Sequence, residues 1–522
     1  MDTACARLDP ASLTLAASLV IASYCAAMYF SKGSALLLAS VPFLAPTAAA
    51  DVDLAWYPPS GSKVNDLDSA LNADGAYGFI YDSSDTPDDK YGTYNWCNMP
   101  HVRKREYVQA PAEYELQYVE LVHRHHKRTP YASNAFPVEP YHWNCDDQGL
   151  FYYGEPFEGH DPSRTYWKGY TSNVNPFVPS GWIGTCQFPQ ITSQGLDDSW
   201  VHGRDLYGVY HDLLGFLPRN KGDWASKVRY RVTNNVITSQ VAGMVVNGMW
   251  GAKDSVPLSI QAAGIDSLEP QYSCPAASRL FNAIKSSANA AWQDHLTASA
   301  GLFATLDDIS GVPPSDGGFH ASFDHYYDNL SARQCHAKPL PCKLVDGANS
   351  TTCVTQALAD AVYRLGNWEY SQIYRDAPDS LAASVASYGV WIAELAENLR
   401  AAVAGTNEVI YAHNVAHDGS VSRLLSILQL DEMVWPGMGS EVVFELYKKR
   451  AKGTKPGRGP RPGPPPAGGA DEHYVRVLFN GQVLKSSSPT LGLMDMIPAQ
   501  TLLAYFDGLV GERAGLVKGL CK

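Results

Sequence analysis

The chain has 522 residues, 45% of them hydrophobic and 18% charged, which is enough for a large core or two domains and excludes a disordered protein. The formal net charge of −13 argues against general nucleic-acid binding, because an acidic molecule repels a phosphate backbone. Any attraction for anions must therefore come from a local cluster of basic side chains.

The first fifty residues contain two apolar stretches, Leu13–Phe30 and Ala35–Ala50. The second is typical of a secretory signal, because it ends in the small-residue cleavage site Ala48-x-Ala50. We therefore predict a leader over residues 1–50, with residues 1–27 as an upstream extension, and a secreted protein. The alternative is that Leu13–Phe30 is retained as an anchor in the secretory pathway, and only then is a membrane partner expected.

Cysteine usage also favours export. Cys5 and Cys25 lie in the leader, and the remaining eight favour disulfide bonds in an oxidising compartment. No Cys-x-x-Cys pair occurs, so the usual zinc-site spacing is absent. Asn329-Leu330-Ser331 and Asn349-Ser350-Thr351 are glycosylation sequons if the chain is exported. The eight cysteines are Cys97, Cys145, Cys186, Cys274, Cys335, Cys342, Cys353 and Cys521.

Residues 51–113 have no sustained period and predict an irregular arm. The next stretch, Tyr114–Pro130, begins with an apolar run typical of a buried strand and ends in the densest cluster of His and Arg in the chain. Open α/β sheets bind ligands beyond the carboxyl ends of their strands, so we expect an anion site there. The cluster consists of His123, Arg124, His125, His126, Lys127 and Arg128.

The residue types in this cluster favour phosphate. Arg124 and Arg128 flank His125, and paired guanidinium groups hold phosphate oxygens through bidentate bonds. Their charge also disfavours protonation of His125, which keeps some of its imidazole neutral and nucleophilic in mild acid. The alternatives are a solvated basic run, a nuclear-targeting tract or a surface metal-binding cluster, and the last predicts metal retained on purification.

The spacing Arg124-His125-x-x-Arg128-x-Pro130 resembles the signature of the histidine acid phosphatases, the second branch of the histidine phosphatase superfamily. His126 stands where that family usually has glycine. The resemblance implies that His125 is the nucleophile and that Arg124 and Arg128 bind phosphate. It implies no metal and no other cofactor, because the arginines neutralise the charge.

Residues 131–189 are rich in aromatic residues, Pro and Gly, and predict a long loop that Cys145 and Cys186 are available to pin. Thr192 is a good N-cap for the helix that follows, and this helix resembles a packing helix of the family. Its place after the nucleophile motif agrees with the family's order.

Lys227–Trp250 predicts a strand, a turn at Asn234-Asn235 and a helix. It resembles the family segment whose second arginine completes the phosphate clamp, but Ile237 stands at that arginine's position. Losing a charge-assisted donor weakens transition-state stabilisation unless another cation replaces it. The candidate replacements are Arg164, Arg229 and Arg231.

Residues 255–404 are predominantly helical, with a Cys- and Pro-rich loop between Cys335 and Cys353. We predict a helical cap inserted into an α/β core that spans residues 114–254 and 405–522. In the family such a cap covers the pocket and sets substrate choice. Three histidines of the cap belong to no motif and are predicted to be ordinary packing or surface residues: His320, His325 and His336.

The predicted strand Val409–Ala412 and loop Asn414–Gly419 precede another helix. His417-Asp418 resembles the family's distal histidine–aspartate pair, in which Asp418 would give a proton to the leaving alcohol and His417 would bind phosphate. The alternative is that Asp418 caps the helix and His417 only packs. His413 is a second candidate for the histidine.

Residues 448–470 form a basic, Pro/Gly-rich tract that predicts a disordered surface loop, with binding to a polyanion or cell wall as the alternative. His473–Leu484 then predicts a β-hairpin whose turn is Asn480-Gly481. The family ends its catalytic domain with a similar hairpin, so the resemblance spans approximately Tyr114–Leu484.

The predicted fold is α/β, with a mostly parallel sheet flanked by helices and an inserted, predominantly α-helical cap domain. The resemblance implies a secreted acid phosphatase that hydrolyses phosphate esters of small molecules or phosphoproteins through a phosphohistidine, with no nucleic-acid partner. Its catalytic residues would be His125 and Asp418, and its phosphate ligands Arg124, Arg128 and His417. The alternative, favoured by Ile237 and His126, is a weakened or inactive pseudo-phosphatase that binds anionic ligands.

Overall fold

The computed structural model describes residues 52–76, 94–138, 141–151, 153–172, 174–178, 181–218, 221–253, 255–450 and 472–522. The predicted leader, including the anchor alternative, and most of the Pro/Gly-rich tract lie outside these residues. Among the helices of the described ranges, none combines the length and the apolar character that a membrane crossing requires.

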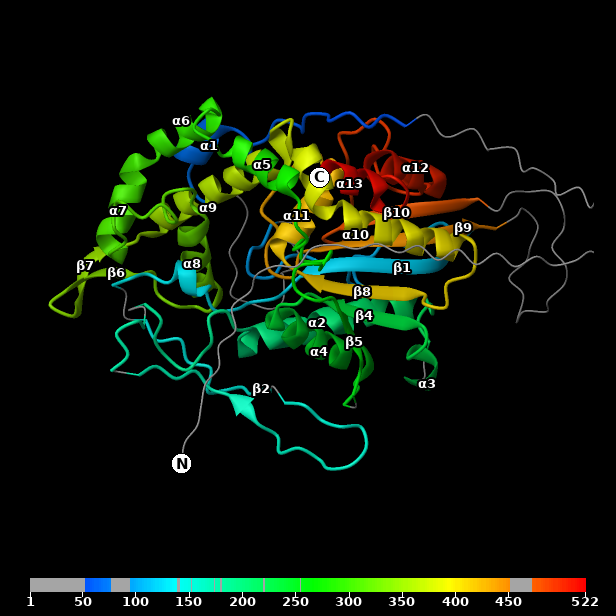
Figure 1. Cartoon of the computed structure of the whole chain (residues 1–522), viewed down its shortest axis with the longest axis horizontal. Coiled ribbons are helices and arrows are strands. Elements are labelled where there is room, and N and C mark those ends of the chain that lie inside the picture. Colours follow the sequence, from blue (N-terminus) through cyan, green and yellow to red (C-terminus); the bar gives the residue numbers. More distant parts are fainter. Residues whose placement is uncertain are drawn as a thin grey trace, which may run out of the picture. The chain divides into compact units, whose positions relative to one another are not determined.

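A mixed sheet of eight strands forms the centre of the fold (Figure 1). Its order is β11-β10-β9-β1-β8-β4-β5, with β12 paired to β10. Strands β1, β8, β4 and β5 are parallel, and the strands beyond β1 on its other side are antiparallel. The strands are β1 (Tyr114–Arg124), β4 (Val228–Val232), β5 (Leu258–Ile260), β8 (Tyr411–Ala416), β9 (Glu441–Lys449), β10 (His473–Phe479), β11 (Gln482–Val483) and β12 (Ile497–Pro498).

Helices cover both faces of the sheet, which explains why β1 is almost continuously apolar. Successive side chains of a strand point to opposite faces, so Tyr118 and Val122 join one core and Val119 and Leu121 the other. The first core contains α10 (Ser380–Val403), α11 (Asp418–Ile427) and α12 (Ala499–Val510), and the second contains α2 (Ser193–Tyr207) and α4 (Val236–Trp250). The predicted α/β fold is confirmed.

A predominantly helical section is inserted between β5 and β8, as predicted, and has a hydrophobic core of its own. That core also includes Trp96 and Trp435, which belong to segments beside the sheet. The Cys-rich stretch predicted as a loop contains a hairpin. The elements are α5 (Pro275–Ile284), α6 (Ala290–Ala298), α7 (Ala300–Ser310), α8 (Asp324–Cys335), β6 (Cys342–Val345), β7 (Ala348–Cys353), α9 (Gln356–Ser371) and the π-helical turn η4 (Gln372–Asp376).

Short elements complete the described chain. The described part of the predicted irregular arm contains one helix, α1, which packs against α9 and is capped by the Asp66 carboxylate accepting from the Ser69 amide. The remaining elements are α1 (Leu67–Asn72), η2 (Ala132–Asn134), β2 (Leu150–Phe151), β3 (Tyr166–Trp167), η3 (Gly208–Leu213), α3 (Lys221–Trp224), η5 (Glu512–Ala514) and α13 (Gly515–Leu520).

Four disulfides join the eight cysteines: Cys97–Cys335, Cys145–Cys186, Cys274–Cys521 and Cys342–Cys353. The second pins the long loop as expected, and the first ties the segment before β1 to α8. The Asn349 sequon lies on the exposed hairpin β6–β7. The Asn329 sequon is unsuitable for a glycan in the folded chain, because its side chain is buried and donates to the Asn134 carbonyl at 2.8 Å.

The local sequence predictions near the site need one correction. The hairpin turn is confirmed, because Asn480 and Gly481 both have positive φ, at 50° and 78°. Asn414 was placed in a loop, but β8 continues to Ala416 and α11 begins at Asp418. The strand tolerates this polar residue because the Asn414 amide donates to the Leu121 carbonyl of β1 at 2.9 Å.

Candidate active site

The parallel register of β1 and β8 brings the two predicted motifs together. Arg124 is the partner of Ala416, so both strands end at the same level and His125 and His417 follow directly. Their ring centroids are 5.3 Å apart. Val232 of β4 lies opposite Val415, so Thr233 reaches the same edge of the sheet. This is the crevice beyond the carboxyl strand ends where the cluster was expected to bind its ligand.

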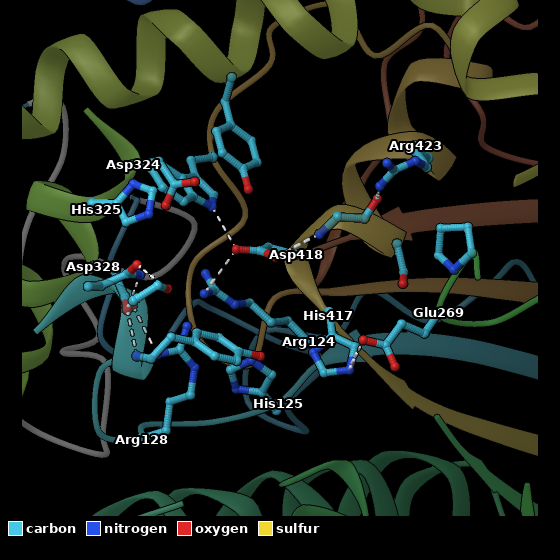
Figure 2. Close-up of a pocket in the computed structure, with 18 of the residues that line it drawn as sticks. Arg124, His125, Arg128, Glu269, Asp324, His325, Asp328, His417, Asp418 and Arg423 are labelled. Carbon is cyan, nitrogen blue, oxygen red and sulfur yellow. Dashed lines mark hydrogen bonds and ion pairs between the residues drawn. The ribbon is translucent and has the colours of Figure 1, made fainter. Parts of the chain in front are cut away.

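Only part of the basic cluster faces the cavity at the strand ends. Arg124, His125 and Arg128 line a cavity of about 500 Å³, together with His417 and Asp418, so all five predicted site residues share one space (Figure 2). His123, His126 and Lys127 do not line it, contrary to the expectation that the whole run lies at the site. Lys127 instead forms a buried ion pair with Asp198 of α2, at 3.2 Å.

Arg124 and Arg128 are held by acceptors on the protein. Arg124 donates to the Pro436 carbonyl at 2.6 Å, pairs with Asp418 at 3.0 Å and stacks over Trp96. Arg128 pairs with Asp328 of α8 at 3.0 Å and donates to the Thr129 carbonyl. Both guanidinium groups are nearly inaccessible, and their Nε–H groups have no hydrogen-bond partner among the described residues. They are fixed donors for an anion.

The geometry of His125 fits a nucleophile. Its Nδ1 lies 2.9 Å from the His126 carbonyl, so Nδ1 carries the hydrogen and Nε2 carries the lone pair. No described residue forms a hydrogen bond with Nε2. Burial, followed by the charges of Arg128 and Arg124, lowers the pKa of His125 well below its ordinary value. The imidazole is therefore neutral in mildly acidic solution.

His417 is positioned by Thr233 and Glu269. Its Nε2 lies 2.9 Å from the Thr233 hydroxyl and 3.5 Å from Glu269 Oε1, and no described residue bonds to its Nδ1. Burial lowers the pKa of His417 to about 4, although Asp418 acts in the opposite direction. One ring nitrogen is thus held by the protein, and the other remains for a ligand.

Asp418 occupies the first position of α11 and faces Arg124. Its Oδ2 accepts from the Trp435 indole at 2.9 Å, and its Oδ1 accepts from the Gly419 amide at 2.8 Å. Burial opposes its ionisation, but Arg124, the Trp435 indole and Arg128 outweigh burial and hold the pKa of Asp418 below its usual value. In the free protein Asp418 is a carboxylate.

Four charged residues of the cavity were missed from the sequence: Glu269, Asp324, Asp328 and Arg423. Asp324 and Asp328 are one helical turn apart on α8, which shows that they share a face but not what that face covers. Enclosure in the cavity wall, followed by Asp328 and Asp418, raises the pKa of Asp324 to about 7. In mildly acidic solution Asp324 is therefore an uncharged acid, whereas Asp418 is already ionised.

Ile237 does not face the cavity. Its side chain is fully buried in the core between α4 and the sheet. The three candidate replacements for the family arginine also lie elsewhere. Arg231 pairs with Glu394 at 2.6 Å, Arg229 lines a different cavity beside it, and Arg164 stacks on Phe151. The arginines that line the site in the described chain are Arg124, Arg128 and Arg423.

The second candidate for the distal histidine, His413, is also excluded from the cavity. It is buried within β8, where its ring packs at a right angle to that of His123, with centroids 4.9 Å apart. One histidine cluster of the described residues could hold a metal ion and does not line the cavity. It consists of His123, His126 and His202.

Comparison with known proteins gives distant relatives. No family model matches the sequence. The chain is 25% identical over 380 residues to Counting factor 60 of Dictyostelium discoideum, an alignment covering 70% of this chain and 80% of that protein. It is 28% identical over 158 residues to 2-phosphoxylose phosphatase 1 of Xenopus tropicalis, which covers 30% of this chain and 26% of that protein.

Solved structures with a similar chain course include two phytases. The apo form of the Hafnia alvei phytase has a TM-score of 0.48 and 13% identity, covering 78% of this chain and 99% of that one. The Citrobacter braakii phytase has a TM-score of 0.47 and 14% identity, covering 77% of this chain and all of that one (100%).

Proposed function

We propose that this protein is a phosphomonoesterase of the histidine acid phosphatase type. The observation that carries the proposal is the convergence of His125, its two flanking arginines, His417 and Asp418 on one cavity. The short alignment with 2-phosphoxylose phosphatase 1 supports the same class of reaction. The four disulfides support a secreted protein, in keeping with the predicted leader.

The first step is attack by His125 Nε2 on phosphorus. A nitrogen–phosphorus bond forms while the bond from phosphorus to the leaving oxygen breaks, and the leaving oxygen takes a proton from Asp418. Arg124, Arg128 and the free nitrogen of His417 hold the equatorial oxygens, where negative charge is concentrated. The product of this step is a phosphohistidine and a free alcohol.

The second step regenerates the enzyme. Water attacks phosphorus and gives its proton to the Asp418 carboxylate, and the electrons of the nitrogen–phosphorus bond return to His125. The proton on Asp418 then leaves with the product phosphate, which restores the carboxylate. Because Asp418 is ionised in the free protein, the proton for the next cycle enters with the substrate. A phosphate monoester carries that proton below about pH 6, the second pKa of phosphate. This accounts for an acidic optimum.

The proposal is tested with p-nitrophenyl phosphate between pH 4 and 7. We expect turnover by the unaltered chain and a loss of about 10³-fold or more in His125→Ala, since removal of a nucleophile abolishes the covalent route. His211→Ala is the matched control, because His211 is paired with Asp212 on the surface away from the cavity. Quenching in alkali, in which a phosphohistidine is stable, should trap labelled phosphate from the substrate on the unaltered chain but not on His125→Ala.

A second function is favoured by one observation, the burial of Ile237 in the core. The cavity then lacks the third clamp arginine of the family motif, and a pseudo-phosphatase that binds phosphorylated ligands without turnover is the alternative. Equal background rates from the unaltered chain and His125→Ala, with binding of inorganic phosphate retained, would establish that alternative.

A further inference from the structure

Three fully buried histidines form a cluster that does not line the cavity and takes no part in the proposed reaction. His123 comes from β1, His126 from the loop after it and His202 from α2. A ring nitrogen of each lies within 4.8 Å of the others. Two of these residues directly flank the Arg124-His125 pair in the sequence, so whatever holds them also holds the phosphate-binding loop.

The hydrogen bonds of two rings fix which nitrogen carries a lone pair. His202 Nε2 lies 2.9 Å from Glu441 Oε2 and donates to it, which leaves the lone pair on Nδ1. His123 Nδ1 lies 2.8 Å from the Arg124 carbonyl and donates to it, which leaves the lone pair on Nε2. A carboxylate or a backbone carbonyl on the far nitrogen is the arrangement that orients metal-binding imidazoles.

Hydrogen bonds within the protein do not satisfy every ring nitrogen of the cluster. His126 Nε2 lies 3.1 Å from His202 Nδ1, and one hydrogen bond joins them. His123 Nε2 and His126 Nδ1 are then buried without a partner among the described residues. Burying a polar nitrogen without a hydrogen-bond partner is unfavourable. In addition, no lysine or arginine of the described chain forms an ion pair with the buried Glu441.

We propose that His123, His126 and His202 bind a divalent transition-metal ion, with Zn²⁺ as the best match. Three neutral imidazoles are a common ligand set for zinc, and water would take the fourth position. Two nitrogens bound to one tetrahedral zinc lie about 3.3 Å apart, close to the 3.1 Å between His126 Nε2 and His202 Nδ1. The ion would accept lone pairs from His123 Nε2, His126 Nε2 and His202 Nδ1 and offset the charge of Glu441, and His126 Nδ1 would then carry a hydrogen without a partner among the described residues.

The neighbouring backbone makes room for this arrangement. Gly439 adopts a left-handed conformation, with φ at 74°, and a Cβ there would lie 2.5 Å from Cε1 of His126. The chain thus places a glycine opposite His126, where the family has its glycine at position 126 itself. Since the three histidines do not line the cavity, the ion has a positioning role: it ties the loop carrying Arg124 and His125 to α2 and, through Glu441, to β9.

This inference departs from the sequence prediction of no metal, and the cluster differs from the surface metal-binding alternative because it is buried. The test uses the full chain produced without a polyhistidine tag and passed over a chelating resin. We expect about one zinc per chain by elemental analysis. Zinc added to apoprotein should raise Tm, and substituted Co²⁺ should give the visible spectrum of a tetrahedral site.

The variants are His126→Gly, which restores the family residue, and His202→Gln, which keeps a polar side chain beside Glu441. Both should lose the metal and the zinc-dependent rise in Tm. His295→Gln is the matched control, because His295 is equally buried and pairs with Glu369 at 2.8 Å but belongs to no such cluster. These readouts do not involve phosphatase activity, so they are independent of the proposed function.

The proposal is overturned if folded unaltered chain retains no metal and binds none of Zn²⁺, Co²⁺, Ni²⁺ or Cu²⁺ in calorimetry. It is also overturned if folded His126→Gly and His202→Gln both keep the same metal content as His295→Gln. If either variant fails to fold by circular dichroism, the measurements on the unaltered chain decide the question.

Discussion

Arg124 and Asp418 form an ion pair of 3.0 Å across the ends of two neighbouring parallel strands. The pair joins the proposed phosphate ligand of one motif to the proposed acid of the other. It also explains why Asp418 is ionised in the free protein. When a phosphate oxygen shares the guanidinium, Arg124 is less available to Asp418, so the carboxyl can accept the proton that the substrate carries.

Asp418→Asn should slow the release of poor leaving groups most. An amide cannot donate the proton that an alkoxide needs, whereas p-nitrophenolate leaves with little help. We expect kcat to fall by about 10²–10⁴-fold with glycerol phosphate and far less with p-nitrophenyl phosphate. Asp308→Asn, on the exposed side of the cap, is the control. Equal losses with both substrates would contradict a proton-donor role.

Asp324 should add to the alkaline fall of activity, which the loss of the substrate's own proton at about pH 6 already begins. Its pKa is raised to about 7, so the carboxyl is neutral below that pH and negative above it. Ionisation adds a charge to the cavity that repels phosphate, and kcat/KM should fall as the pH passes 7. Asp324→Asn should make the fall above pH 7 shallower and leave in place both the fall that substrate ionisation causes at about pH 6 and the acidic limb. An unchanged profile would assign the limit to another group.

Ile237→Arg should not restore the family clamp. The side chain at this position is enclosed in the core on α4, and an uncompensated buried charge costs about 3–5 kcal/mol. We expect the free energy of unfolding in urea to fall by that amount without a gain in activity. Val236→Arg is the matched control, because Val236 is the preceding residue and its side chain is 37% exposed. A rise in kcat/KM for Ile237→Arg would show that the guanidinium reaches the cavity.

The cavity should favour substrates with a single phosphate. Beyond the arginines that hold the reacting phosphate, its wall includes Glu269 and Asp324, and none of its described lining residues is lysine. Among the described lining residues, a second phosphate on the substrate would find Arg423 as the only further arginine or lysine, beside the Glu269 and Asp324 carboxyl groups. We expect kcat/KM for a sugar monophosphate to exceed that for inositol hexakisphosphate at pH 5. The reverse preference would contradict this view of the wall.

Sequence reasoning located the end of β1, because a strand's apolar period is local and its end is marked by polar residues. It ended β8 four residues early, at Ala412, and singled out His417 and Asp418 only through the family resemblance. It also assigned the whole basic run to the site. The structure shows that His123, His126 and Lys127 do not line the cavity, since Lys127 pairs with Asp198 and His126 forms a hydrogen bond with His202.

The remaining site residues depend on tertiary packing that no short pattern encodes. Glu269 lies in a loop and Asp328 on a cap helix, and each faces the cavity only because distant elements place it there. Arg231 was a reasonable replacement for the clamp arginine by sequence distance. It instead forms an ion pair with Glu394 on α10, and this partner can be identified only from the packing of the helix against the sheet.

The ion pair between Arg128 and Asp328 links the loop to the helical section. A phosphate that draws the Arg128 guanidinium toward itself competes with α8 for the same donor. Occupancy of the cavity and the hold of the cap on the core are therefore thermodynamically coupled, and the coupling is reciprocal. Product departure would let Arg128 return to Asp328, so the same carboxylate that steadies the empty enzyme would also help to expel inorganic phosphate.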